Sequence, residues 1–253
     1  MLELHMGWRH LLFANWPVAP EVVEPRIPDA LAVDTFDGRA WLSVVPYVNV
    51  DVRPRRLPAG VGVRLPELNL RTYVRPDGDS ARPSEDSEGS NRTPGVYFFS
   101  LDADGLPGIG LASVLGARLL HALPYYYADI DCSVGADGSV RFESRRRHPG
   151  ARPVRFRATY SPTGEAFRPD PDSLAEFLTE RYRFYTEAPS GGIRYADVRH
   201  RRWSLREATV EIEENTLFRA NGFANPGGDP TCYYSPGLDV LASPNRELGT
   251  DRR

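Results

Sequence analysis

The sequence contains no lysine: all 31 basic residues among the 253 are arginine. Without lysine there is no side-chain amine to form a Schiff base with a carbonyl substrate, so imine chemistry on a side chain is excluded. The net charge of -3 also provides no excess of positive charge to attract nucleic acid. We therefore expect no nucleic-acid partner.

Cysteine and long apolar runs are scarce as well. Cys132 and Cys232 lie far apart with no CxxC motif, and we predict two free, small apolar side chains rather than a disulfide or a metal pair. The five histidines form no ligand pattern, so we expect no metal and no cofactor. No segment approaches the ~18 apolar residues of a membrane span. We expect no membrane partner, a reducing cytoplasm as the location, and a short leader over residues 1–7 outside the fold.

The 23 prolines and 22 glycines predict many turns and few long helices, with 41% hydrophobic residues to supply a core. Two helices are predicted. The first covers residues 109–121, and the second begins at the Ser173/Glu176 capping box and carries a row of apolar side chains at helical spacing that reaches Tyr185. The polar stretch 75–94 is predicted to be a disordered loop. About ten strands are predicted, and they favour a barrel or sandwich that forms a single domain over residues 8–246. We expect a break in one strand at Pro46, and arginine side chains that face solvent on the strands near residues 140–160. The predicted strands are 8–18, 39–52, 65–74, 96–101, 125–134, 140–145, 154–160, 194–198, 207–213, 216–222 and 239–242.

The strand Leu65 to Val74 alternates strictly, so that Glu67, Asn69, Arg71 and Tyr73 share one face. That polar face is either the wet side of an antiparallel sheet or the lining of an interior. In the second case Arg71 could bind a carboxylate with its guanidinium, and Glu67 could act as an acid or base. Glu67 would then balance buried arginine charge, and its removal should destabilise the protein. The pattern alone leaves both readings open.

A second group is Arg118 on an otherwise apolar helix, followed by Tyr125, Tyr126 and Tyr127. The Arg118 guanidinium must reach water, pair with an internal carboxylate or meet an anionic ligand. His121 fits the end of the helix better than a catalytic base. The nearby Gly108-Ile-Gly-Leu-Ala-Ser113 superficially resembles a dinucleotide-binding turn, but its last glycine is missing, which makes a nucleotide-dependent oxidoreductase a distant alternative.

The segment Gly116 to Tyr126 is similar in spacing to the stretch of acetoacetate decarboxylases that carries two adjacent lysines, here Tyr125 and Tyr126. More broadly, the chain from about residue 8 to 242 resembles the YqjF-like family of unknown function, which is grouped with the acetoacetate decarboxylase-like superfamily. The motifs that carry this resemblance are Trp41 with Pro46, Glu67-Leu-Asn-Leu-Arg71-Thr-Tyr-Val, Gly95-Val-Tyr-Phe-Phe-Ser-Leu-Asp102, Leu123-Pro-Tyr125, Leu178-Thr-Glu-Arg181-Tyr182, His200 with Trp203, and Ser235-Pro-Gly-Leu-Asp239-Val.

The resemblance implies a mainly β (α+β) fold: a closed, distorted antiparallel β-barrel with two or three flanking helices and a ligand pocket inside. It favours the interior reading of Glu67, Asn69 and Arg71, but it does not transfer the lysine-dependent reaction. We expect a small, carboxylated or enolisable organic molecule as partner, with Arg71 and Arg118 on the anion, Glu67 as the acid or base, and Asn69, Tyr73, Tyr125, Tyr126 and Tyr127 as other contacts. The alternative is a non-catalytic sensor that uses the same pocket. Related decarboxylases form oligomers, so self-association is a further expectation, although no segment identifies an interface.

Overall fold

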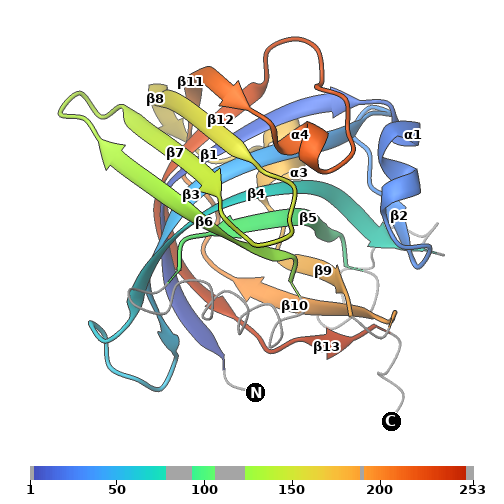
Figure 1. Cartoon of the computed structure of the whole chain (residues 1–253), viewed down its shortest axis with the longest axis horizontal. Coiled ribbons are helices and arrows are strands. Elements are labelled where there is room, and N and C mark those ends of the chain that lie inside the picture. The colour runs from blue at the N-terminus through green and yellow to red at the C-terminus, as the bar shows by residue number, and fades with distance from the viewer. Residues whose placement is uncertain (1–2, 78–92, 106–122, 189–190, 249–253) are drawn as a thin grey trace.

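The computed structural model describes residues 3–77, 93–105, 123–188 and 191–248, and the chain in these ranges is mainly β with few, short helices (Figure 1). The helical segments are α1 (Pro20–Val23), the 3-10 turn η1 (Glu24–Arg26), α3 (Leu174–Thr179) and α4 (Leu217–Ala220). The strands are β1 (Leu4–Val18), β2 (Leu31–Val33), β3 (Ala40–Pro54), β4 (Val63–Pro76), β5 (Gly95–Ala103), β6 (Tyr125–Val134), β7 (Val140–Arg146), β8 (Arg155–Phe167), β9 (Arg183–Glu187), β10 (Ile193–Arg199), β11 (Leu205–Asn215), β12 (Thr231–Ala242) and β13 (Arg246–Glu247).

These strands form one hydrogen-bonded sheet in the order β13-β10-β9-β5-β6-β7-β8-β11-β12-β1-β3-β4-β2. Two further pairings, β5 with β4 and β10 with β12, join strands that are distant in this order. Most neighbours are antiparallel, as predicted, but β5 runs parallel to both β6 and β9. In Figure 1, β1, β3, β4 and β5 cross the middle of the molecule, with β6, β7 and β8 on one side and β9, β10 and β13 on the other.

The central strands bury both of their faces. Leu12 of β1 and Leu68 of β4 belong to one apolar cluster, while Leu11 and Phe13, the neighbours of Leu12 along β1, belong to another. Because successive side chains of a strand point to opposite faces, one strand can contribute to two cores at once. The polar face of β4 therefore lies inside the molecule.

Several segments differ from the sequence predictions. Strand β1 begins at Leu4, inside the stretch assigned to a leader, because Leu4 pairs with Pro54 and Ala242. Pro46 does not break β3: it lies where the β1–β3 register shifts between Arg9 and Ala14, and a missing N–H is tolerated at such an irregularity.

Other differences concern the second half of the chain and the loop. The predicted capping box forms, because Ser173 Oγ accepts a 3.2 Å hydrogen bond from the Glu176 N–H. The helix nevertheless ends at Thr179. Tyr185 belongs instead to strand β9, which pairs with β5 and β10. The strand predicted over 216–222 is the short helix α4, whose start is favoured by a 3.0 Å bond from the Leu217 N–H to Asn215 Oδ1.

The predicted loop 75–94 and helix 109–121 lie largely outside the described residues. Of the loop, Arg75 and Pro76 complete β4 and pair with β2. The Gly108–Ser113 motif, Arg118 and His121 all fall in the part of the chain that the structure does not describe. Most of the remaining strand predictions are confirmed to within a few residues at each end, and β6 at both ends. The exceptions are β8, which continues to Phe167 rather than ending at 160, and β12, which begins at Thr231 rather than at 239.

Candidate functional site

A cavity of about 140 Å³ lies on the face of β4 that carries Glu67, Asn69 and Arg71. Its walls are largely apolar and come from β1, β3, β5, β9, β10 and the segment before β11. Strands β3, β4 and β6 contribute the polar and charged groups Tyr47, Asn49, Glu67, Asn69, Arg71 and Tyr125, and other polar lining residues include Thr179, Arg181, Arg183, Ser243 and Asn245. A small cavity with few polar groups among apolar side chains is typical of a ligand site.

Register places these groups together. Glu67 is opposite Tyr47 of β3, and Asn69 is opposite Val45 of β3 and Leu101 of β5. The parallel pairing of Leu101 with Tyr125 then brings the first residue of β6 to the same face. Glu67 is 5% and Asn69 2% exposed, so this polar row is not a wet sheet face.

The Glu67 carboxyl group is held by two tyrosine hydroxyls. The Tyr47 hydroxyl donates to Oε2 at 2.5 Å, and the Tyr125 hydroxyl donates to Oε1 at 3.3 Å. Burial raises the pKa of Glu67 from its ordinary 4.5 to about 7, although the hydrogen bonds from Tyr47, Tyr125 and Asn49 oppose that rise. Burial also raises the pKa of both tyrosines well above 10, so they act as hydrogen-bond donors at neutral pH. Glu67 is thus suited to both gaining and losing a proton near neutrality.

Arg71 is the arginine of this cavity that has no carboxylate partner among the residues that the structure describes. Its Nη2 makes one long bond of 3.4 Å to the Leu178 carbonyl oxygen, and its Nε is buried without an acceptor. The guanidinium carbon lies 5.4 Å from the centre of the Phe13 ring.

The two other arginines of the cavity wall are paired. Arg181 contacts Asp34 at 2.8 Å and Arg183 contacts Asp197 at 2.7 Å. Of the two partners expected for a buried Arg71, Glu67 or a bound anion, Glu67 forms no ion pair with it in the described structure, where Arg71 hydrogen-bonds only to the Leu178 carbonyl oxygen and keeps an unpaired Nε. Arg71 is therefore available to bind an anion from outside the chain.

Two amide oxygens add to the unsatisfied groups of this cavity. Asn49 Oδ1 and Asn69 Oδ1 are both buried without a hydrogen-bond partner. Buried polar atoms in proteins are almost always paired, so unpaired ones beside a cavity indicate a ligand or water that completes them.

The comparisons with known proteins agree with this architecture. Residues 5–239 match the family model DUF2071, described as an uncharacterized conserved protein. The chain belongs to the DUF2071 family. The uncharacterized protein YqjF of Bacillus subtilis strain 168 is 39% identical over 245 residues, which cover 96% of this chain and 92% of YqjF. The resemblance to the YqjF-like family is thereby confirmed.

Solved structures with the acetoacetate decarboxylase-like fold are similar at low sequence identity. An acetoacetate decarboxylase-like enzyme from Sphingomonas wittichii RW1 superposes with a TM-score of 0.61 at 14% identity, covering 98% of this chain and 92% of that one. The enduracididine biosynthesis enzyme MppR complexed with pyruvate gives 0.61 at 12% identity, with 98% and 90% covered. The acetoacetate decarboxylase of Legionella pneumophila gives 0.55 at 12%, with 97% and 87% covered. At these identities the similarity shows the fold alone.

The remaining predicted site residues of this DUF2071 chain lie elsewhere. Tyr73 does not line the cavity, and its buried hydroxyl bonds to Ser43 Oγ and to the Leu178 carbonyl oxygen, each at 2.8 Å. Tyr126 points away from the cavity, with the Arg146 guanidinium carbon 4.0 Å from its ring centre. Tyr127 is outside the cavity lining, and its N–H donates to His148 Nδ1 at 3.1 Å.

Sequence reasoning missed Tyr47 and Asn49. Both occupy alternate positions of β3 together with Val45, which is the same period-two signal that singled out β4. The largely apolar stretch from Trp41 to Val48 hides that signal, because both faces of β3 are buried there.

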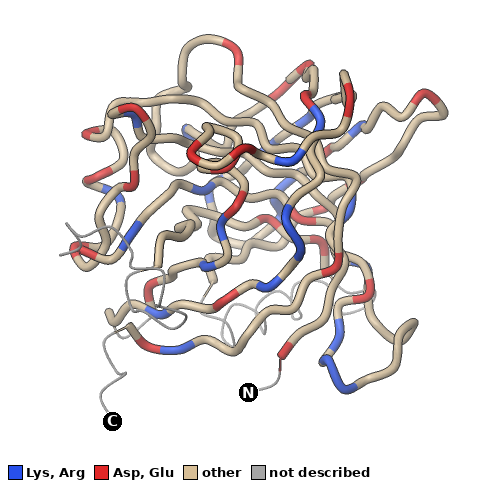
Figure 2. The backbone as a smooth tube through the Cα atoms, turned by 180° about the vertical axis from the view of Figure 1, so that it is seen from behind, with Lys and Arg blue, Asp and Glu red and all other residues tan. Residues whose placement is uncertain are grey.

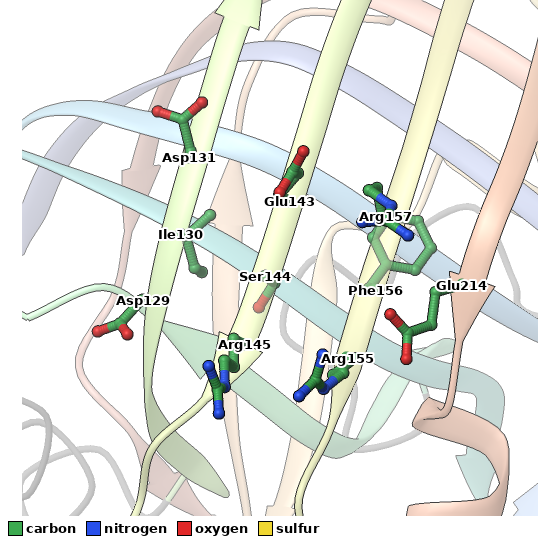
Figure 3. A pocket seen from close by; sticks show the side chains of 10 residues that line it. All are labelled: Asp129, Ile130, Asp131, Glu143, Ser144, Arg145, Arg155, Phe156, Arg157 and Glu214. Atoms are coloured by element: carbon green, nitrogen blue, oxygen red, sulfur yellow. The ribbon is translucent and has the colours of Figure 1, made fainter.

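A second, wider hollow of about 420 Å³ lies on the opposite side of the sheet, over β6, β7, β8 and β11 (Figure 3). It is open to solvent, and Figure 3 shows acidic and basic side chains standing on neighbouring strands. Arg145 and Arg155 of this hollow are exposed, as is Arg141 elsewhere on β7, in agreement with the predicted solvated arginine rows. Figure 2 shows both signs of charge interspersed along the chain. Exposed ion pairs of this kind contribute little to stability or recognition.

Two searches of the described residues complete the inventory. No three His, Cys, Asp or Glu side chains gather in a way that could hold a metal ion. Within the same residues, no helix has both the length and the apolar character needed to cross a membrane. Cys132 and Cys232 are both free, as predicted.

Proposed function

We propose that this protein binds a small carboxylated, enolisable organic molecule in the cavity between β4 and β6, and that Glu67 moves a proton to or from it. The carrying observation is that an unpaired arginine and a near-neutral carboxyl group share one apolar cavity. The pyruvate complex of the fold neighbour MppR supports a small acid as the class of ligand. Arg71 would bind the carboxylate, and Asn69 and Asn49 would meet a further polar group.

The mechanism follows from the donors around Glu67. Its ionised form takes a proton from a carbon next to a carbonyl group, and the C–H electrons pass into the enolate. The Tyr125 hydroxyl exchanges its long hydrogen bond to Oε1 for one to the developing oxyanion, which leaves Oε1 to accept the carbon-bound proton, while Tyr47 keeps Oε2 oriented. This route needs no imine and is therefore compatible with a chain that lacks lysine.

The architecture that would enclose this site is part of the proposal. The pairings of β4 with β5 and of β10 with β12 support a closed, distorted β-barrel around the cavity. The continuous sheet supports one acetoacetate decarboxylase-like domain over the predicted residues 8–246, extended at its start to Leu4. The free Cys132 and Cys232 support a reducing cytoplasm as the location.

Binding is tested by stabilisation with small carboxylates, measured as the shift in melting temperature and by calorimetry. Arg71→Met should weaken binding by about tenfold to a hundredfold, the loss expected for a charge-assisted hydrogen-bonded pair. Arg75→Met is the matched control, because Arg75 lies on the same strand, outside the cavity, with a side chain 45% exposed. Equal binding by wild type and Arg71→Met would contradict the assignment.

Catalysis is tested separately by hydrogen–deuterium exchange at the carbons next to a ligand's carbonyl group, followed by NMR. Glu67→Gln should keep carboxylate binding and lose the exchange. The alternative, a sensor, is favoured by the engagement of both Glu67 oxygens with tyrosine hydroxyls, which also suits a fixed binding wall. Binding without any exchange in the wild type would establish the sensor.

A further inference from the structure

The polar groups of the cavity are arranged along the length of β4 rather than around one point. Glu67, Asn69 and Arg71 occupy alternate positions of a stretch whose register with β3 is unbroken from Leu65 to Thr72. At about 3.3 Å per residue, the four steps from Glu67 to Arg71 span about 13 Å, and Asn69 stands at the midpoint.

Side-chain contacts at the two ends confirm that the groups serve different parts of the cavity. Glu67 is engaged by Tyr47 and Tyr125. Arg71 instead lies beside Phe13 and the Leu178 carbonyl oxygen. No direct ion pair joins Glu67 to Arg71 in the described structure, as expected for groups held apart by the strand.

Because both side chains project from the same face of β4, this Cα separation approximates the distance between the groups that contact the anion and the reacting carbon of a ligand. Two polar contacts of about 2.9 Å each leave about 7 Å of the 13 Å span. With C–C bonds of about 1.5 Å in a zigzag chain, that gap corresponds to roughly five or six bonds. The cavity volume of about 140 Å³ has room for on the order of ten non-hydrogen atoms, if each occupies the space of one water-sized sphere.

We propose, building on the function proposed above, that the ligand is an extended keto acid of six or seven carbons whose ketone lies at the end remote from its carboxylate. The carboxylate binds Arg71, the methylene chain passes Asn69 along the apolar walls, and the ketone lies between Glu67 and Tyr125. Glu67 takes a proton from a carbon next to this remote ketone, and the resulting enolate oxygen accepts the Tyr125 hydrogen bond. Acids in which the carboxylate and the ketone are adjacent cannot reach both ends.

Positional isomers of equal size separate this spacing from a simple preference for larger molecules. The probes are 2-oxohexanoate and 5-oxohexanoate, with pyruvate as a short acid, 6-oxoheptanoate as a second fitting one and 8-oxononanoate as one that exceeds the cavity. Binding is measured by calorimetry, and exchange of the hydrogens next to the ketone is followed by NMR in deuterated water. Arg71→Met, Glu67→Gln and the Arg75→Met control accompany the wild type.

We expect 5-oxohexanoate and 6-oxoheptanoate to bind at least tenfold more tightly than pyruvate, since each methylene buried against apolar walls adds roughly threefold to fourfold. Exchange should be catalysed with these two acids and not with 2-oxohexanoate, and 8-oxononanoate should bind more weakly than either. Hydrogen exchange of 2-oxohexanoate as fast as or faster than that of 5-oxohexanoate would overturn the proposed spacing between carboxylate and ketone. In that case the proposed function would still stand if Arg71→Met abolished binding and Glu67→Gln abolished exchange. Absence of binding by every acid would overturn the proposed function itself.

Discussion

The Tyr47 hydroxyl donates a 2.5 Å hydrogen bond to Glu67 Oε2, and the two residues are direct partners in the β3–β4 register. The bond therefore joins side chains that the backbone already holds opposite one another. Because a carboxylate accepts this bond better than a neutral carboxyl group does, Tyr47 lowers the pKa that burial raises.

Tyr47→Phe should therefore raise the pKa of Glu67 above that of the wild type. Tyr125→Phe should act in the same direction but less, because its bond is longer, at 3.3 Å against 2.5 Å. The titration is followed by infrared absorption of the carboxyl group, with Glu67→Gln used to assign the band. A Glu67 pKa that stays unchanged in Tyr47→Phe would show that the hydroxyl does not act on the carboxylate.

Glu67 also makes stability depend on pH. Its folded-state pKa of about 7 lies above the ordinary 4.5, so the folded protein binds more protons between these values. The stability contributed by the protonated group is fully present below about pH 4.5 and is lost as the pH rises through 7. The loss amounts to about 3 kcal/mol.

Denaturant titrations of wild type and Glu67→Gln between pH 6 and 8 isolate this contribution, because both proteins retain Asp102, whose pKa of about 6 falls at the edge of this range, and its effect cancels in the difference. The wild type should lose stability relative to Glu67→Gln across this range, and at pH 8 the variant should be at least as stable. This reverses the expectation from the sequence, which assumed that Glu67 compensates arginine charge. Parallel curves for the two proteins would rule out the raised pKa.

The sequence predicted the elements of this fold where a single period dominates. The alternation of β4 placed Glu67, Asn69 and Arg71 on one face, and the structure brings these three to one cavity. The same alternation grouped Tyr73 with them, but two residues further along the strand its hydroxyl is already satisfied by Ser43 and Leu178. The alternation of side chains predicts which face of the strand a residue occupies, but it does not predict how far along the strand the cavity extends.

Other parts of the site depend on contacts that no local pattern contains. Tyr125 reaches Glu67 because β6 pairs parallel to β5, a connection between strands that lie apart in sequence. Helical spacing from Leu174 continues to Tyr185, yet the chain leaves the helix after Thr179 because β5 and β10 offer backbone partners to β9. Tertiary pairing overrides local propensity at both places.

The absence of lysine gives a chemical prediction that separates this chain from Schiff-base decarboxylases. Treatment with borohydride in the presence of a keto acid should leave no adduct on any side chain, since no side-chain amine exists to form the imine. Peptide mapping by mass spectrometry gives the readout, with a lysine-dependent decarboxylase as the positive control. A mass shift on an internal residue would contradict the proposed imine-independent route.

The buried ion pair between Arg146 and Asp102 lies behind the cavity, on the other face of β5 and β6. Its side chains are 4% and 0% exposed, and Asp102 Oδ1 accepts from Arg146 Nε at 2.7 Å and lies 2.6 Å from Nη2. Breaking such a pair leaves one uncompensated buried charge, so Arg146→Met and Asp102→Asn should each cost about 3 kcal/mol of stability at pH 8.

The cost of Arg146→Met should shrink at pH 5, because Asp102, whose pKa burial raises to about 6, can then be buried in its neutral form. The double variant Arg146→Met/Asp102→Asn should cost less than the sum of the single ones by about 2 kcal/mol, since neither charge is left alone. Urea unfolding of the four proteins gives the coupling energy. Arg141→Met is the control, because Arg141 lies on the same strand β7 with a side chain 47% exposed, where the loss should stay within about 0.5 kcal/mol. Strictly additive effects of the two buried substitutions would show that the charges do not stabilise one another.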